Sequence, residues 1–118
     1  MIKRAISIRQ PWVEQILRGI KKKEYRDIPT NIRERVYLYA SLRPDGSARD
    51  WHRVKSNPGQ LPVGKIVGTV EVTRCSWDHR RGCYAYDLER PKRLKSPRKA
   101  TNQPQPIWWR PRFSDNHP

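Results

Sequence analysis

The sequence has few of the residues that disulfide-rich, secreted or membrane-spanning proteins depend on. Among its 118 residues only Cys75 and Cys83 are cysteines, which excludes a disulfide-rich scaffold and favours two free thiols over a single bridge. No apolar run approaches the ~18 residues of a membrane span, and no charged-then-apolar leader begins the chain. We therefore expect an intracellular protein without a membrane partner, most simply cytoplasmic, with the nucleoid or the nucleus as alternatives.

Acidic residues are also scarce. The chain has 11 aspartates and glutamates against 26 lysines and arginines, which gives a formal net charge of +15. So basic a composition favours a polyanionic partner, most simply nucleic acid, either RNA or DNA. A basic surface without a specific partner is the alternative, and the sequence leaves protein partners open. An anionic membrane is disfavoured, because no basic amphipathic helix of useful length accompanies the charge.

Apolar residues make up 35% of the chain, so we expect one domain with a small core. Strand signals separated by turns, with only one or two short helical segments, predict an α+β, barrel-like fold. We expect strands at 4–8, 22–26, 36–40, 65–75, 83–88 and 107–109, and helices at 11–18 and 48–55. Ser47 is placed to cap the second helix, and Gly68 suggests a bulge or bend in the longest strand. Residues 76–82 have the composition of a polar loop.

The segment 90–99 is the most basic part of the chain, with six cations and no acid. Pro91 and Pro97 argue against a helix there, so we expect an extended basic loop that contacts phosphates. A merely solvated loop is the alternative. The domain is expected to cover residues 1–113, and 114–118 to form a disordered C-terminal tail.

The densest pattern is Ser7-Ile8-Arg9-Gln10-Pro11-Trp12 followed by Gly19-x-Lys21-x-x-Glu24-x-Arg26. Pro11 suits the first turn of a helix and Gly19 the position just after its end. If the segment after Gly19 is a strand, Glu24 and Arg26 share one face and alternate with Tyr25. Charged groups then lie beside a helix start, where unpaired backbone N–H groups favour an anion or a carbonyl oxygen. The sequence therefore predicts a site for a polar ligand.

These motifs, followed by Tyr39-Ala40-Ser41 and a late Ile107-Trp108, resemble the ASCH domain, the activating-signal-cointegrator homology domain of the PUA-like superfamily. The resemblance covers most of the chain, from about Ile2 to Trp109. It implies a small PUA-like β-barrel with one or two short helices that binds RNA or DNA. It also implies a ligand cleft between the Gln10–Trp12 turn and the Lys21–Arg26 strand. A minority of the family are enzymes.

Individual side chains in these motifs have the chemistry that nucleic-acid binding needs. Gln10 offers a donor and an acceptor to a base edge, Trp12 and Trp77 offer flat faces for stacking, and the basic residues suit phosphates. Core packing of Trp12, backbone capping by Gln10 and ordinary salt bridges are the alternatives. The residues expected to contact nucleic acid are Gln10, Pro11, Trp12, Lys21, Glu24, Arg26, Ser41, Arg74, Trp77, Arg80, Arg81, Lys92, Arg93 and Lys95.

Lys21 and Glu24 also permit a catalytic interpretation, as a ribonuclease or an amide hydrolase acting on acylated cytidine. In the amide hydrolases of the family a threonine stands three residues after the lysine, whereas this chain has Glu24 there. A carboxylate can serve as a general base but replaces a hydroxyl nucleophile poorly, so binding is favoured over catalysis. A protein-interaction module is a third interpretation. We expect no cofactor, and no metal site, since Cys75, His79 and Cys83 lack a fourth ligand.

Overall fold

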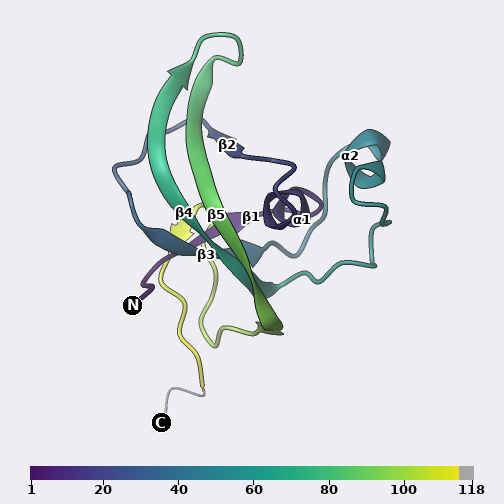
Figure 1. The fold of residues 1–118 in the computed structure, drawn as a ribbon. Helices are drawn as coiled ribbons and strands as arrows, with labels where there is room; N and C mark the ends of the chain where they lie inside the picture. The colour runs from purple at the N-terminus through teal and green to yellow at the C-terminus, as the bar shows by residue number, and fades with distance from the viewer. Residues whose placement is uncertain (115–118) are drawn as a thin grey trace.

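The computed structural model describes residues 1–114, and only Ser114 of the predicted tail lies within that range. The elements in chain order are β1 (Ala5–Ile8), α1 (Trp12–Leu17), β2 (Lys23–Arg26), β3 (Arg35–Ala40), α2 (Ala48–His52), β4 (Lys65–Asp78), β5 (Cys83–Arg98) and β6 (Trp108–Trp109). Figure 1 shows the strands gathered into one body, with α1 beside it and α2 on a projecting segment. The fold is α+β, as the sequence predicts.

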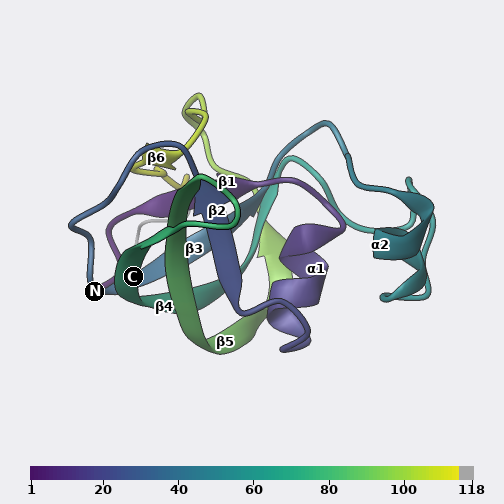
Figure 2. The ribbon, with the colours of Figure 1, turned by 90° about the horizontal axis from the view of Figure 1, so that it is seen from above.

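All strands belong to one sheet of six, in the order β2-β5-β4-β3-β1-β6. β1 pairs with β3 in parallel, and the other neighbours are antiparallel. The sheet is strongly curved (Figure 2), yet within residues 1–114 no strand pairing joins its edge strands, β2 and β6. Strand pairing therefore does not close the sheet into the predicted β-barrel. A side chain spans the opening instead: Arg26 Nη2 of β2 donates to the carbonyl oxygen of Ser7 in β1, at 2.7 Å.

The hairpin of β4 and β5 is longer than the sequence predicts. β4 continues through residues 76–78, and residues 90–98 are part of β5 and not an extended loop. Beyond Asp87 the strand pairs with β4 alone, because the pairing with β2 covers only Tyr84 to Asp87. Proline is tolerated on such an edge, where its missing N–H removes no ladder bond. Pro91 and Pro97 thus exclude a helix without excluding a strand.

The sheet has an apolar cluster on each face. The larger cluster lies under α1 and includes Ile6, Leu38, Val70 and Tyr86, all fully buried. The smaller cluster lies on the opposite face, where Phe113 of the C-terminal segment packs against it. Its buried members are Ala5, Tyr39, Ile66 and Trp109. This second cluster leaves the rest of its face for polar and basic residues.

The two helices follow local signals in the sequence. α1 buries Val13 and Ile16 against the sheet, and the chain turns at Gly19, whose φ of 76° favours glycine. α2 begins at a capping box, in which Ser47 and Asp50 each bond to the other's backbone N–H. Within residues 1–114 neither helix is long and apolar enough to cross a membrane.

Candidate nucleic-acid interface

A cleft of about 640 Å³ lies between α1, β2 and the tip of the β4–β5 hairpin. It is the place where the motif at 7–26 comes together with part of the basic hairpin. Two aromatic side chains, three consecutive lysines and an arginine lie on its walls. The lining residues are Trp12, Gln15, Ile20, Lys21, Lys22, Lys23, Glu24, Tyr25, Asp50 and Arg81.

A chain of ion pairs is built around Glu24 at one side of the cleft. Lys21 Nζ lies 3.6 Å from Glu24 Oε1, and Arg26 Nη2 lies 2.7 Å from Glu24 Oε2. Glu24 is only 7% exposed, and Arg26 is held in turn by the Ser7 carbonyl. A buried carboxylate between two cations has little conformational freedom. The arrangement therefore presents a fixed carboxylate edge and a lysine ammonium side by side.

Burial makes the Lys21 ammonium less favourable. It lowers the pKa of Lys21 below its ordinary value of 10.5, and the nearby Arg81 and Arg26 cations add to this effect. The Glu24 carboxylate acts in the opposite direction and raises the pKa. Lys21 thus loses its proton more easily than an ordinary lysine does.

Tyr25 brings the hairpin tip to the cleft. The Arg81 guanidinium lies 3.9 Å from the centroid of the Tyr25 ring, and Lys21 Nζ lies 5.0 Å from it. Cations at these distances are attracted to the face of an aromatic ring. Two cations from distant parts of the chain are therefore gathered around one half-buried aromatic ring, the combination found where a base stacks beside its phosphate.

The Gln10–Trp12 turn contributes unequally to the cleft. Gln10 is fully buried: its Nε2 donates to the Pro62 carbonyl at 3.0 Å, and its Oε1 accepts from the Glu14 N–H at 3.1 Å. Both ends of its amide are thus occupied, and Pro11 beside it is also buried. Trp12 is half-buried and lines the cleft. The structure places Gln10 and Pro11 behind the cleft and Trp12 on its wall.

Other predicted residues lie around the cleft without lining it. Arg74 is exposed, and it lies opposite Asp87, which in turn lies opposite Lys23. Because alternate residues of a strand share a face, Arg74 lies on the same sheet face as Tyr25. Trp77 is 48% exposed and lies on the other face, where it contacts the Tyr84 ring edge-on at 5.1 Å. Arg80 is an exposed residue of the hairpin turn, and Ser41 is half-buried after β3.

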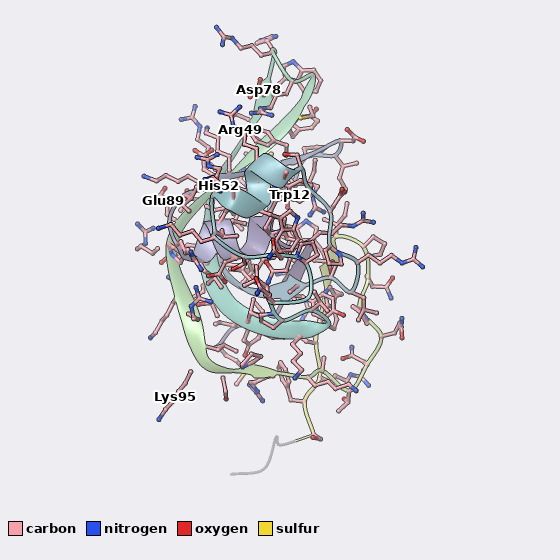
Figure 3. All side chains as sticks on the ribbon, turned by 90° about the vertical axis from the view of Figure 1, so that its right-hand side faces the viewer. Trp12, Arg49, His52, Asp78, Glu89 and Lys95 are labelled. Atoms are coloured by element: carbon pink, nitrogen blue, oxygen red, sulfur yellow. The ribbon has the colours of Figure 1, made fainter. Side chains whose placement is uncertain are left out.

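The basic segment of β5 does not reach the cleft. Lys92, Arg93 and Lys95 lie toward the far end of the strand from the hairpin tip, and Figure 3 shows Asp78 and Lys95 at opposite ends of the molecule. Arg93 is turned toward α1, where both its terminal nitrogens bond to Glu14. The side chains of Lys92 and Lys95 lie along a separate groove. The structure thus separates the two basic segments that the sequence predicts around one ligand.

Sequence reasoning missed several residues that build this region. Tyr25 lies next to Glu24 in the motif, but no neighbouring residue indicates that its ring faces an exposed arginine of the hairpin turn. Glu14 gave a signal that was overlooked, since an acid between Val13 and Ile16 lies on the apolar stripe of α1 and needs a partner when buried. Arg93 is that partner.

The three potential zinc ligands do not gather. Cys75 and Cys83 are free thiols, and within residues 1–114 no group of three or more histidine, cysteine or acidic side chains could hold a metal ion. Their spacing of four residues reflects positions on the two strands of the hairpin and its turn.

The sequence matches the model of a known protein family. The model of the ASCH domain matches residues 6–102, which include α1, β2 and the whole β4–β5 hairpin. No curated protein matches the chain. ASCH domains are PUA-like and generally bind RNA. The match covers most of the chain, and the protein belongs to the ASCH domain family.

Proposed function

We propose that this domain binds nucleic acid, RNA in the first place, and holds a nucleotide in the cleft between α1, β2 and the hairpin tip. One observation supports this most: Arg81 of the hairpin turn meets Lys21, Glu24 and Tyr25, which are close together in the sequence, within one cleft. The net charge of +15 supplies the general attraction to a polyanion. The family's usual ligand agrees with this chemistry.

Each group in the cleft has a distinct role in this proposal. Tyr25 and Trp12 provide faces on which a base can stack. Arg81 and Lys21 contact phosphate oxygens, and the Glu24 carboxylate accepts from an exocyclic amino or ring N–H group of the base. Arg26 holds Glu24 in place from behind. Gln10 and Pro11 act indirectly, because they fix the turn from which α1 and Trp12 begin.

Residues around the cleft extend the contact along the strand. Arg74 and Arg80 contact phosphates on either side of the bound nucleotide, without regard to sequence. Trp77, exposed beside Tyr84, offers a second stacking surface at the hairpin tip. Ser41 does not line the cleft, so its hydroxyl contacts the bound strand only at the edge of the site.

The test is equilibrium binding of short single- and double-stranded RNA and DNA, followed by fluorescence anisotropy across a salt series. Arg81→Gln should weaken binding to all sequences and reduce the salt slope by about 0.7 to 0.9. Glu24→Gln should change base preference more than the salt slope. Arg43→Gln is the matched control, because it removes the same charge from the exposed loop after β3. No binding at moderate salt would contradict the proposal, and so would equal losses in the cleft variants and the control.

A second function is favoured by one observation, the lowered pKa of the buried Lys21 beside a carboxylate. A lysine that loses its proton more easily can act as a general base on a nucleic acid or a modified nucleoside, with Glu24 as its partner. Gel analysis of the RNA after each binding measurement, and incubation with acetylated cytidine, test this activity. Turnover abolished by Lys21→Ala would establish an enzyme; intact probe and substrate would leave the domain a binder.

A further inference from the structure

A second groove lies on the opposite face of the sheet from α1. It has a volume of about 490 Å³ and lies over strands β3, β4 and β5. Strand pairing fixes the face: Lys92 pairs with Thr69 and Thr69 with Tyr37, whereas the next residue, Arg93, pairs with Gly68 on the side that faces α1. We call this the far-face groove, defined by Arg35, Tyr37, Thr69, Lys92, Lys95 and Arg98.

Cations dominate the far-face groove. Among residues 1–114 no aspartate or glutamate lines it, and neither Lys92 nor Lys95 forms an ion pair. Arg35 is held in position, since its Nη1 donates to Thr69 Oγ1 and its Nη2 to the Arg90 carbonyl, both at 2.8 Å, and its Nη2 also pairs with Glu71 Oε1 at 3.3 Å. An ordered guanidinium beside two exposed ammonium groups is suited to phosphate oxygens.

The groove also has an aromatic wall. The Arg98 guanidinium lies 3.7 Å from the Phe113 ring centroid, and the Phe113 ring meets Tyr37 edge-on at 5.7 Å. This stacking fixes the orientation of the guanidinium and brings a cation and an aromatic ring together at the groove. Cations next to an aromatic wall match a nucleic-acid strand better than a purely acidic peptide.

The far-face groove is separate from the cleft. β2 pairs with β5 only between Tyr84 and Asp87, whereas the lysines and Arg98 of the groove come later in the strand. At the rise of a strand, Lys92 is about 15 Å and Arg98 about 35 Å beyond Asp87. The lysines and Arg98 of the groove thus lie well beyond the end of β2, so a strand must run along β5 to reach both surfaces.

We propose that the far-face groove binds the sugar–phosphate backbone of RNA as a second contact surface, independent of the cleft. This inference rests on the proposed function, because it takes the ligand class from it. A long strand would pass over β5 and engage both surfaces, and a short strand would occupy only the cleft. The second surface adds affinity through linkage and makes binding dependent on length.

The test compares single-stranded RNA of about 6 and about 30 nucleotides, one near the lower end of the site size of a small domain, about 4 to 16 nucleotides, and one well above it. Lys92→Gln with Lys95→Gln should reduce the salt slope for the longer probe by about 1.4, because two phosphate contacts are lost. Binding of the shorter probe should not change. Arg43→Gln with Arg53→Gln removes the same charge outside both surfaces and is the control. Both lysines are exposed without ion pairs, so a thermal melt should confirm that the double variant is folded.

The outcomes separate the two proposals. If the lysine variant keeps the full salt slope on the longer probe while Arg81→Gln weakens binding, the far-face groove is not a contact surface and the cleft proposal stands. An equal loss on both probes would show one continuous surface and overturn the independence of the groove. If the unmodified protein binds neither probe at low salt, both proposals fail.

Discussion

The Glu14 carboxylate in α1 accepts two hydrogen bonds from Arg93 in β5, with Oε–Nη distances of 2.9 and 2.8 Å. Arg18 Nε donates a third at 2.7 Å. Burial alone would raise the pKa of Glu14, but the hydrogen bonds from the two arginines outweigh it and hold the pKa below the ordinary 4.5. The pair fastens α1 to the sheet beside the cleft, so a residue from the most basic segment of the chain has a structural partner.

Arg93→Gln should destabilise the fold by about 1 to 2 kcal/mol, because the buried Glu14 loses its bidentate partner. The value is at the low end because half of the Arg93 side chain is exposed. Glu14 has a lowered pKa, so its stabilisation is present above pH 4.5 and is lost as the pH falls below that value. Urea unfolding at pH 7 and pH 3 measures both effects. Lys92→Gln is the control and should change stability by less than about 0.5 kcal/mol. Equal stability of the two variants would contradict the role of Arg93.

Glu24→Gln should lower the pKa of Lys21 further, because the carboxylate is the group that raises it against the effect of burial. Since the folded pKa is below 10.5, the unfolded chain binds this proton more tightly, and stability rises with pH in the alkaline range below 10.5. The variant should make that rise steeper. NMR titration of labelled lysines measures the pKa directly, with Lys65 as an exposed reference. A Lys21 pKa that is unchanged or higher in Glu24→Gln would show that the pair does not form.

Arg90→Gln should raise the pKa of Glu71 from about 2 toward its ordinary 4.5, because hydrogen bonds from Arg90 are the main cause of the lowering. Arg35 remains beside Glu71, so the pKa should stay below 4.5. The contribution of this pair to stability is present above pH 4.5 and is lost as the pH falls through about 2. Carboxyl-detected NMR titration checks the shift, and Arg80→Gln should leave Glu71 unmoved. A Glu71 that titrates normally in the unmodified protein would contradict the network.

Gly68→Ala should destabilise the fold by about 1 to 3 kcal/mol through overpacking. An added Cβ would lie 2.6 Å from the Lys92 carbonyl oxygen and 2.6 Å from Leu17 Cδ2. The leucine can be shortened but the backbone cannot, so adding Leu17→Ala should not restore stability. Thermal unfolding of the single and double variants measures this. Full recovery in the double variant would show that only the leucine opposes the methyl group.

Local signals in the sequence were sufficient for the elements that depend on near neighbours. Ser47 with Asp50 caps α2 as predicted, and Pro11 to Gly19 bounds α1 within a residue or two. The bulge at Gly68 also appears, as a shift of register in the pairing of β4 with β5. For the two helices the deciding interaction lies within a few positions of the residue that signals it.

The remaining features depend on contacts that are distant in sequence. Residues 90–98 continue a strand because β4 lies beside them, and nothing within the segment itself indicates that neighbour. Gln10 has the composition of a base-reading residue but is buried, since Pro62 and Glu14 occupy its amide. The curvature of the sheet could be anticipated from the family resemblance, whereas the absence of pairing between β2 and β6 could not.

Lys92 and Arg93 are adjacent in the chain and lie on opposite faces of β5, one in the far-face groove and the other against Glu14. The net charge of residues 90–98 therefore does not indicate what each side chain contacts. The alternation of residues between the two faces of the strand indicates this better. Deleting one residue between Leu88 and Lys92 would exchange the two faces. A lysine would then be turned toward the helix and an arginine toward solvent, with the net charge of the segment almost unchanged. Variation of length in this strand should be tolerated far less than variation among its basic side chains.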